Sequence, residues 1–114
     1  MKITKSIQQC IDACLACAFA CERCATACLT EEEQLPMLTR CISLDRECAA
    51  VCFTTAKVMS MQGEHMEQLG QLCAKICDAC AAECERHAQM GHCKACADAC
   101  RACAQACRQL EMVA

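Results

Sequence analysis

The sequence predicts an all-α protein, an antiparallel up-down-up-down four-helix bundle with a cysteine-lined core. Three observations predict this fold. The 18 cysteines recur at steps of mostly three and four residues, alanine is abundant while valine and isoleucine are few, and only short turn segments separate the cysteine-bearing stretches. A chain of 114 residues has room for one domain. We therefore expect residues 1–114 to form a single four-helix-bundle domain.

The first predicted helix begins after a cap at Thr4 or Ser6 and runs to about Leu29. Its cysteines follow steps of four, three, four, three and four, which place all their side chains on one helix face: Cys10, Cys14, Cys17, Cys21, Cys24 and Cys28. Cysteine can fill a core as a small hydrophobic residue. Packing alone, however, gives no reason to exclude leucine from so many successive inward positions. The pattern is therefore typical of a row of metal ligands.

The second helix is expected from about Pro36, in its first turn, to Gln62, with Gly63 as its left-handed terminus. Residues 30–33 resemble a capping box, a threonine followed three residues later by glutamate. The inward cysteines of this helix are Cys41, Cys48 and Cys52.

The third helix is expected over about residues 64–90, with Gly91 as its stop, and the fourth over about residues 92–112. Both repeat the same inward spacing of cysteines, which are Cys73, Cys77, Cys80 and Cys84, then Cys93, Cys96, Cys100, Cys103 and Cys107. Because the three connections are short, successive helices should be antiparallel neighbours.

The two ends of this bundle should differ in chemistry. We call the apolar end the plug, and expect there Ile3, Ile7, Thr55, Met59, Met66, Leu69 and Leu110. We call the other end the mouth, and expect there Cys28, Met37, Cys41, Cys84, His87, Met90, His92 and Cys93.

The Cys-x-x-x-Cys and Cys-x-x-Cys spacings put two sulfur atoms of one helix within reach of a single small ion. Cu(I) is soft, prefers sulfur ligands and accepts two or three of them. Zinc prefers four ligands in a tetrahedron, and iron–sulfur clusters use cysteines on loops, so both suit one continuous helix less well. If sulfurs bridge ions, the capacity approaches about one Cu(I) per cysteine. Each ion would replace a thiol proton at nearly constant charge.

Histidine and methionine could add ligands at the mouth. His87 continues the cysteine spacing three residues after Cys84, and His92 precedes Cys93. Met37 and Met90 could be weak thioether ligands, although methionine is more often a gap-filler. His65, at the turn between the second and third helices, is expected to be solvated.

Other function classes fit less well. The net charge of −3 is scattered in both signs, which does not predict nucleic-acid binding. The N-terminus lacks the apolar run of a secretion signal, and Asp12, Glu22 and Arg23 interrupt the first helix as a membrane span. Two cysteines four residues apart on one helix have Cβ atoms too far apart to form an unstrained disulfide bond. We therefore expect a cytoplasmic setting, where thiols stay reduced.

Ligands for so many Cu(I) ions indicate a store of copper, and two alternatives stay open: a thiol–disulfide redox protein that uses its Cys-x-x-Cys pairs, and a Zn or Fe–S scaffold. The redox alternative requires an exposed thiol of low pKa, whereas the pattern buries thiols uniformly. We expect no enzymatic activity.

In its four helical segments with inward Cys-x-x-x-Cys and Cys-x-x-Cys pairs, the chain closely resembles the bacterial cytosolic copper storage proteins. The resemblance covers the whole chain and implies a bundle filled with Cu(I), assembled as a homotetramer, that stores or sequesters copper. A copper donor or acceptor protein is a further expected partner. Thr55 and Met59 stand where more thiols might be expected. Secreted relatives use methionine at the mouth, whereas His87 and His92 indicate a histidine-bearing mouth here.

Apolar residues predicted on the outer faces of the first two helices favour self-association. They are Ile11, Leu15, Phe19, Phe53 and Val58.

Overall fold

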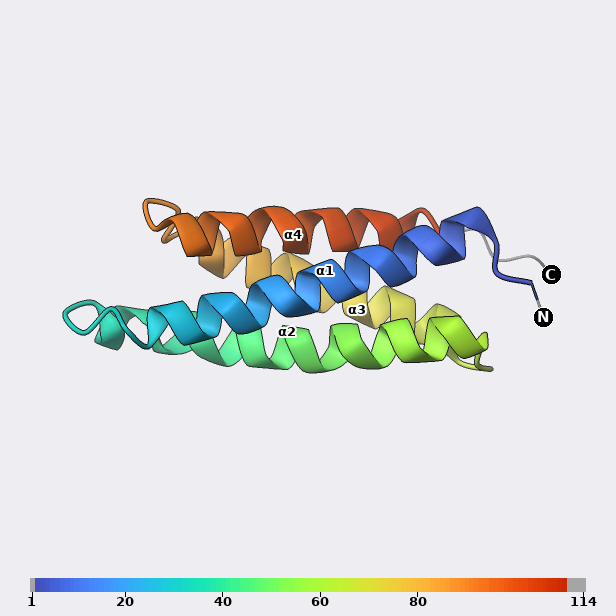
Figure 1. The fold of residues 1–114 in the computed structure, drawn as a ribbon, viewed down its shortest axis with the longest axis horizontal. Coiled ribbons are helices and arrows are strands. Elements are labelled where there is room, and N and C mark those ends of the chain that lie inside the picture. The colour runs from blue at the N-terminus through green and yellow to red at the C-terminus, as the bar shows by residue number, and fades with distance from the viewer. Residues whose placement is uncertain (1, 111–114) are drawn as a thin grey trace.

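The computed structural model describes residues 2–110, which fold into an elongated bundle (Figure 1). Each helix packs against the next in the chain, and α1 also packs against α4, so neighbours run antiparallel. The described part of the chain contains no strand. The predicted all-α four-helix bundle is confirmed, with the helices α1 (Lys5–Cys28), α2 (Leu35–Met61), α3 (Met66–Glu85) and α4 (Gly91–Arg108).

The helix starts agree with the sequence in two of three details. Thr4 caps α1, since its side-chain oxygen accepts the backbone N–H of Ile7 at 3.2 Å. Pro36 lies in the first turn of α2. The predicted capping box at residues 30–33 is wrong, because the Thr30 hydroxyl instead donates to the carbonyl of Ala27 at 2.7 Å. Gln34 is the N-cap of α2 and makes no side-chain capping hydrogen bond.

The left-handed residue after α2 is Gln62, with φ of 49°, and not the predicted Gly63. The helix ends one residue earlier than expected, so the reversal of the backbone falls on Gln62. Its side-chain amide donates to the carbonyl of Lys2 at 2.7 Å, which ties this turn to the start of the chain.

The helix α3 ends at Glu85 rather than near Met90, and Gly91 begins α4 instead of stopping α3. Backbone hydrogen bonds between residues three apart tighten the end of α3: the amide of His87 donates to the carbonyl of Cys84 at 2.9 Å. The resulting turn lets His87 fold back into the bundle, where it is buried. The predicted end of the fourth helix near Met112 lies outside the described residues.

All the cysteines are buried and unpaired as disulfides. Alanines flank the cysteine faces and are also buried, among them Ala18, Ala49, Ala74 and Ala97. Such small side chains allow close helix approach. None of the helices in the described part combines the length and apolar character that crossing a membrane requires.

Two inward assignments were displaced by one position, and one outward assignment was wrong. Met37 is 60% exposed, and its neighbour Leu38 is fully buried in its place. Leu69 is half-buried, whereas Gly70 faces the core. Ile11, expected on the outer face, is buried. Each shift reflects the rotation of a helix about its axis, which the contacts with its neighbours set.

Candidate metal centre

The core of the bundle is a continuous series of sulfur atoms contributed by all four helices. Close contacts between helices include Cys10 to Cys107 at 3.3 Å and Cys41 to Cys84 at 3.5 Å. Cys52 reaches Cys77 at 3.6 Å. These distances exceed a covalent S–S bond but are short enough for one ion to contact both sulfurs.

Within one helix, the sulfurs that come within 4.0 Å belong to residues four apart, such as Cys24 and Cys28 at 3.9 Å. Members of a Cys-x-x-Cys pair instead turn to sulfurs of other helices. Cys14 contacts Cys103 at 3.6 Å, and Cys17 contacts Cys100 at 3.6 Å. The Cys-x-x-x-Cys spacing therefore makes pairs along a helix, while the Cys-x-x-Cys spacing spreads sulfurs toward different neighbours.

Several groups of four cysteines bring their sulfur atoms within 4.8 Å of one another. Cys17, Cys21, Cys100 and Cys103 each belong to two of these groups and so link four of them into one series, whereas the group of Cys24, Cys28, Cys41 and Cys93 at the mouth shares no cysteine with those four. Five of these groups are Cys14, Cys73, Cys103, Cys107; Cys17, Cys21, Cys48, Cys100; Cys17, Cys52, Cys77, Cys103; Cys21, Cys80, Cys96, Cys100; and Cys24, Cys28, Cys41, Cys93. A shared sulfur suits a thiolate that bridges two ions.

Burial and the hydrogen bonds between thiols determine which of these cysteines are protonated. Burial raises the pKa of Cys28 to about 11. In the close pair at the plug end, the hydrogen bond from Cys107 lowers the pKa of Cys10, and the same bond raises the pKa of Cys107. One thiolate is thus stabilised by a neighbour that stays protonated. The array cannot hold a thiolate at every position unless cations replace the protons.

Asp45 is a member of the core that the sequence reasoning missed. It is fully buried on α2, and its carboxylate accepts hydrogen bonds from Cys80 and Cys96 at 3.2 Å and from Cys84 at 3.5 Å. Burial, reinforced by the charge of Cys96, raises the pKa of Asp45 to about 8. The seven-residue gap between Cys41 and Cys48 was the available signal, since Asp45 fills the inward position that divides it into steps of four and three.

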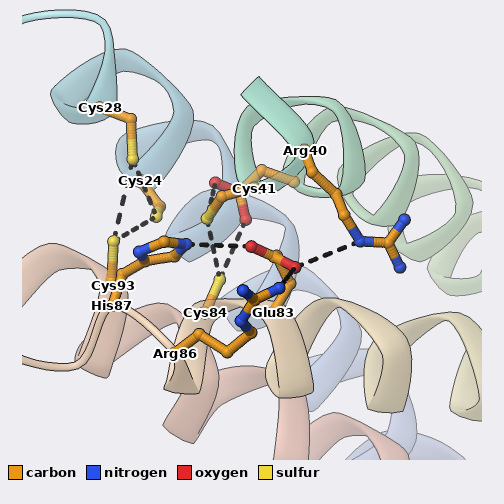
Figure 2. A network of polar contacts seen from close by, with 10 residues as sticks. Cys24, Cys28, Arg40, Cys41, Glu83, Cys84, Arg86, His87 and Cys93 are labelled. Carbon is orange, nitrogen blue, oxygen red and sulfur yellow. Dashed lines mark hydrogen bonds and ion pairs between the residues drawn. The ribbon is translucent and has the colours of Figure 1, made fainter. Parts of the chain in front are cut away.

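A second unpredicted carboxylate, Glu83, anchors the mouth (Figure 2). It is 5% exposed, and its Oε2 atom accepts a hydrogen bond from Nε2 of His87 at 3.0 Å. Its Oε1 atom accepts from Nε of Arg40 at 3.2 Å and lies 3.4 Å from Nη1 of Arg86. His87 itself is buried, as its predicted place in the inward spacing requires.

The other residues predicted at the mouth are only partly brought together. Met90 is buried, and His92 is half-buried with its Nε2 atom enclosed and without a hydrogen-bond partner. Met37 lies on the exposed face of α2, away from the core. His65 is exposed at the start of α3, in agreement with the expectation that it is solvated.

The plug end contains the buried residues Ile7, Thr55, Met59 and Met66, as predicted. It also borders a surface pocket of about 370 Å³, which the sequence did not predict. The pocket is lined by Glu67, Gln71, Ala74, Cys107, Arg108 and Leu110. Cys107 is the most exposed cysteine, although only at 7%.

Comparisons with known proteins agree with this geometry. The model of a family described as copper storage protein matches residues 3–112. The chain is similar to a cytosolic copper storage protein from Streptomyces lividans, solved with five coppers, at 45% identity and a TM-score of 0.88 over 92% of this chain and 91% of that one. It is also similar to the Cu(I)-bound copper storage protein BsCsp3, at 45% identity and a TM-score of 0.86 over 91% and 96% of the two chains.

A further relative is the cysteine-rich protein YhjQ of Bacillus subtilis (strain 168), which is 46% identical over 71 residues. The aligned region covers 62% of this chain and 65% of that relative, so the chain matches somewhat less than two thirds of its length.

Proposed function

The chain belongs to the copper storage protein family, and from this premise we propose that it stores many Cu(I) ions on the thiolates that line its core. The observation that carries the proposal is the series of buried sulfur atoms along the bundle, in which four of the groups of four are linked by shared members. A single structural or catalytic metal site needs only a few of these ligands. A series that runs along the bundle is suited to a cargo of ions.

The chemistry of the ligands favours Cu(I) over Zn(II). Thiolate and thioether ligands select soft ions, and Cu(I) accepts two or three of them. Pairs of sulfurs 3.9–4.0 Å apart, as at Cys24–Cys28 and Cys73–Cys77, leave room for an ion that both sulfurs contact. Where two groups share a sulfur, as at Cys17 and Cys100, that sulfur can bridge two ions, which raises the capacity toward about one ion per cysteine.

We propose that all the cysteines are copper ligands and that His87, His92 and Met90 add ligands at the mouth. His87 and Met90 are buried there, and the enclosed Nε2 atom of His92 lacks a protein partner. Met37 is exposed on α2 and would meet copper only outside the bundle.

We place this storage in the cytosol, where the Streptomyces lividans relative is described, and propose that residues 1–114 act as one domain without enzymatic activity. Every thiol is at most 7% exposed. A thiol–disulfide exchange protein needs a reactive thiolate that its substrate can reach, so this burial favours storage over the redox alternative. A donor or acceptor protein would then deliver and remove the copper.

We also propose that the chain assembles as a homotetramer. Leu15, Phe19 and Phe53 are exposed, and the two phenylalanine rings from α1 and α2 lie edge to face with centroids 5.5 Å apart. This apolar surface supports association. Light scattering on the metal-free and Cu(I)-loaded protein would reveal the assembly, and a monomer in both states would contradict it.

The proposed function is tested by an anaerobic titration of the reduced protein with Cu(I). We expect saturation at a number of ions on the order of the number of cysteines. A variant with serine at Cys24, Cys28, Cys41 and Cys93 should lose capacity but not all of it, because the other four groups named above contain none of these cysteines. Saturation of the unaltered protein at about one to four ions would contradict storage and favour a structural site or a chaperone.

A further inference from the structure

Glu83 is a buried charge that copper storage by thiolates does not by itself explain. It lies on α3 next to Cys84, and none of its hydrogen bonds goes to a sulfur. Burying a carboxylate costs several kcal/mol unless cations and hydrogen bonds compensate it. The burial of Glu83 at the mouth therefore indicates a role at this end of the bundle.

The partners of Glu83 divide between its two oxygen atoms. Oε1 is held by the guanidinium groups of Arg40, from α2, and Arg86, from the turn after α3, whereas among residues 2–110 Oε2 is held by His87 alone. Guanidinium groups are always charged and can only donate hydrogen bonds. The two arginines therefore fix the carboxylate in place and leave Oε2 as an acceptor aimed at His87.

This contact determines which nitrogen of His87 is free. A neutral imidazole has one N–H donor and one nitrogen with a lone pair. Since Nε2 lies 3.0 Å from a carboxylate oxygen, the proton resides on Nε2 and the lone pair on Nδ1. In Figure 2 the second ring nitrogen of His87 points away from Glu83, on the side where the sulfur of Cys93 is drawn, with Cys24 and Cys28 next to it.

We infer that Glu83 is a positioning residue, which holds His87 in the tautomer that leaves the lone pair on Nδ1, the nitrogen on the side of Cys93. Histidines that bind metal commonly donate their other N–H to a carboxylate, which fixes the ring orientation and raises its basicity as a ligand. Here Glu83 would do so for an ion that arrives at the mouth. The inference rests on the proposed function for the identity of the ion, but the tautomer of His87 can be measured without metal.

The variant Glu83→Gln offers a sharp test because it keeps the shape of the side chain. The two arginines can only donate, so the single amide oxygen should stay with them and the amide NH₂ should face His87. Nε2 would then have to accept a hydrogen bond, and the proton would move to Nδ1. The control is Glu85→Gln, the same change at an exposed glutamate whose partner is Arg101.

The first measurement is the nitrogen NMR spectrum of the histidine rings in reduced, metal-free protein, with His87 assigned by the loss of its signals in His87→Gln. We expect the neutral ring to carry its proton on Nε2 in the unaltered protein and in Glu85→Gln, and on Nδ1 in Glu83→Gln. A proton on Nδ1 in the unaltered protein overturns the inference, whether or not the Glu83 variant folds.

The second measurement is the rate of Cu(I) uptake from a bicinchoninate chelator. Partners of ligating histidines typically contribute about tenfold or more, so early uptake by Glu83→Gln should be roughly tenfold slower, with the final capacity unchanged. Early uptake at the unaltered rate in folded Glu83→Gln overturns the positioning role. If the unaltered protein failed to bind many ions, the proposed storage would be contradicted. The tautomer of His87 measured by NMR would still test whether Glu83 positions the ring.

Discussion

Two carboxylates are buried among the described residues, and different partners compensate them. Glu83 is surrounded by two arginines and a histidine, whereas Asp45 has only thiols around it. Thiols donate weak hydrogen bonds and bring no positive charge. Burial therefore raises the pKa of Asp45 to about 8, and the side chain is charged in the folded protein only above about that pH.

The raised pKa of Asp45 predicts a pH-dependent stability of the metal-free protein. The ordinary pKa is 3.8, so between about pH 4 and about pH 8 the folded state binds the proton and the unfolded state releases it. Protonated Asp45 therefore makes its whole contribution to the free energy of unfolding below about pH 4. This contribution, several kcal/mol in all, is lost as the pH rises to about 8. Asp45→Asn should remove this loss.

The measurement is urea unfolding of the reduced, metal-free protein and of Asp45→Asn across this pH range. Asp12→Asn, at an exposed position on α1, is the control and should leave the pH dependence unchanged. A free energy of unfolding that depends on pH equally in all three proteins would contradict the prediction.

At the scale of the helix, the ends hold most of the differences from expectation. A glycine after an apolar segment predicts a left-handed residue, yet Gln62 takes that conformation and Gly91 begins a helix. No glycine in the described part has a positive φ. The effects of adding a Cβ atom at Gly63 and at Gly91 can therefore be compared from the space around each residue alone.

Replacing Gly91 by alanine should stabilise the protein, whereas the same change at Gly63 should not. A Cβ atom at Gly91 would meet nothing within 4 Å, so the reduced freedom of the unfolded chain should contribute about 0.4–1 kcal/mol. A Cβ atom at Gly63 would lie 2.8 Å from Cγ1 of Val58, so the turn must shift. Chemical denaturation of both reduced variants measures the difference, and equal effects would contradict it.

The helices should form before copper binds. Thr4 caps α1, and Arg101 joins α4 to Asp78 and Glu85 of α3 at 3.1 and 2.8 Å, without any metal contribution. Alanine-rich segments also favour helix on their own. Circular dichroism of reduced, metal-free protein should therefore show little gain of helix on adding Cu(I). A transition from coil to helix would instead indicate a scaffold that metal folds.

At the scale of the whole molecule, the two ends of the bundle offer copper different routes. The mouth has buried His87 and Met90 beside Cys28 and Cys93, which lie 3.8 Å apart. The plug has apolar residues in its core but borders the pocket that reaches Cys107. An ion can pass from ligand to ligand at the mouth, so we expect copper to enter there.

Replacing His87 and His92 together by phenylalanine should slow both uptake and removal of Cu(I), while the final capacity stays nearly unchanged because the cysteines remain. Leu110→Phe is the matched control, since it narrows the pocket at Cys107. The rates are measured with a coloured Cu(I) chelator. Unchanged rates in the double variant together with slower rates in Leu110→Phe would show that copper enters at the plug.

The fold and the ligand-bearing faces could be predicted from the spacing of the residues. The helical repeat of 3.6 residues converts steps of three and four into one face, so the cysteines from Cys10 to Cys107 were placed inward before any neighbour was known. The burial of His87 also followed from its spacing after Cys84. Local geometry fixed these features, and no contact between helices was needed to predict them.

The packing between helices determined which of two adjacent residues faces inward near the helix ends, as for Leu38 over Met37 and Gly70 over Leu69. It also decided where α3 stops, which sulfurs approach across helices, and that Asp45 and Glu83 are buried with partners from other elements. The physical reason is that a periodic pattern defines a face only to within a fraction of a turn. The rotation of each helix about its axis, and the partner of each buried polar group, are set by the side chains of its neighbours.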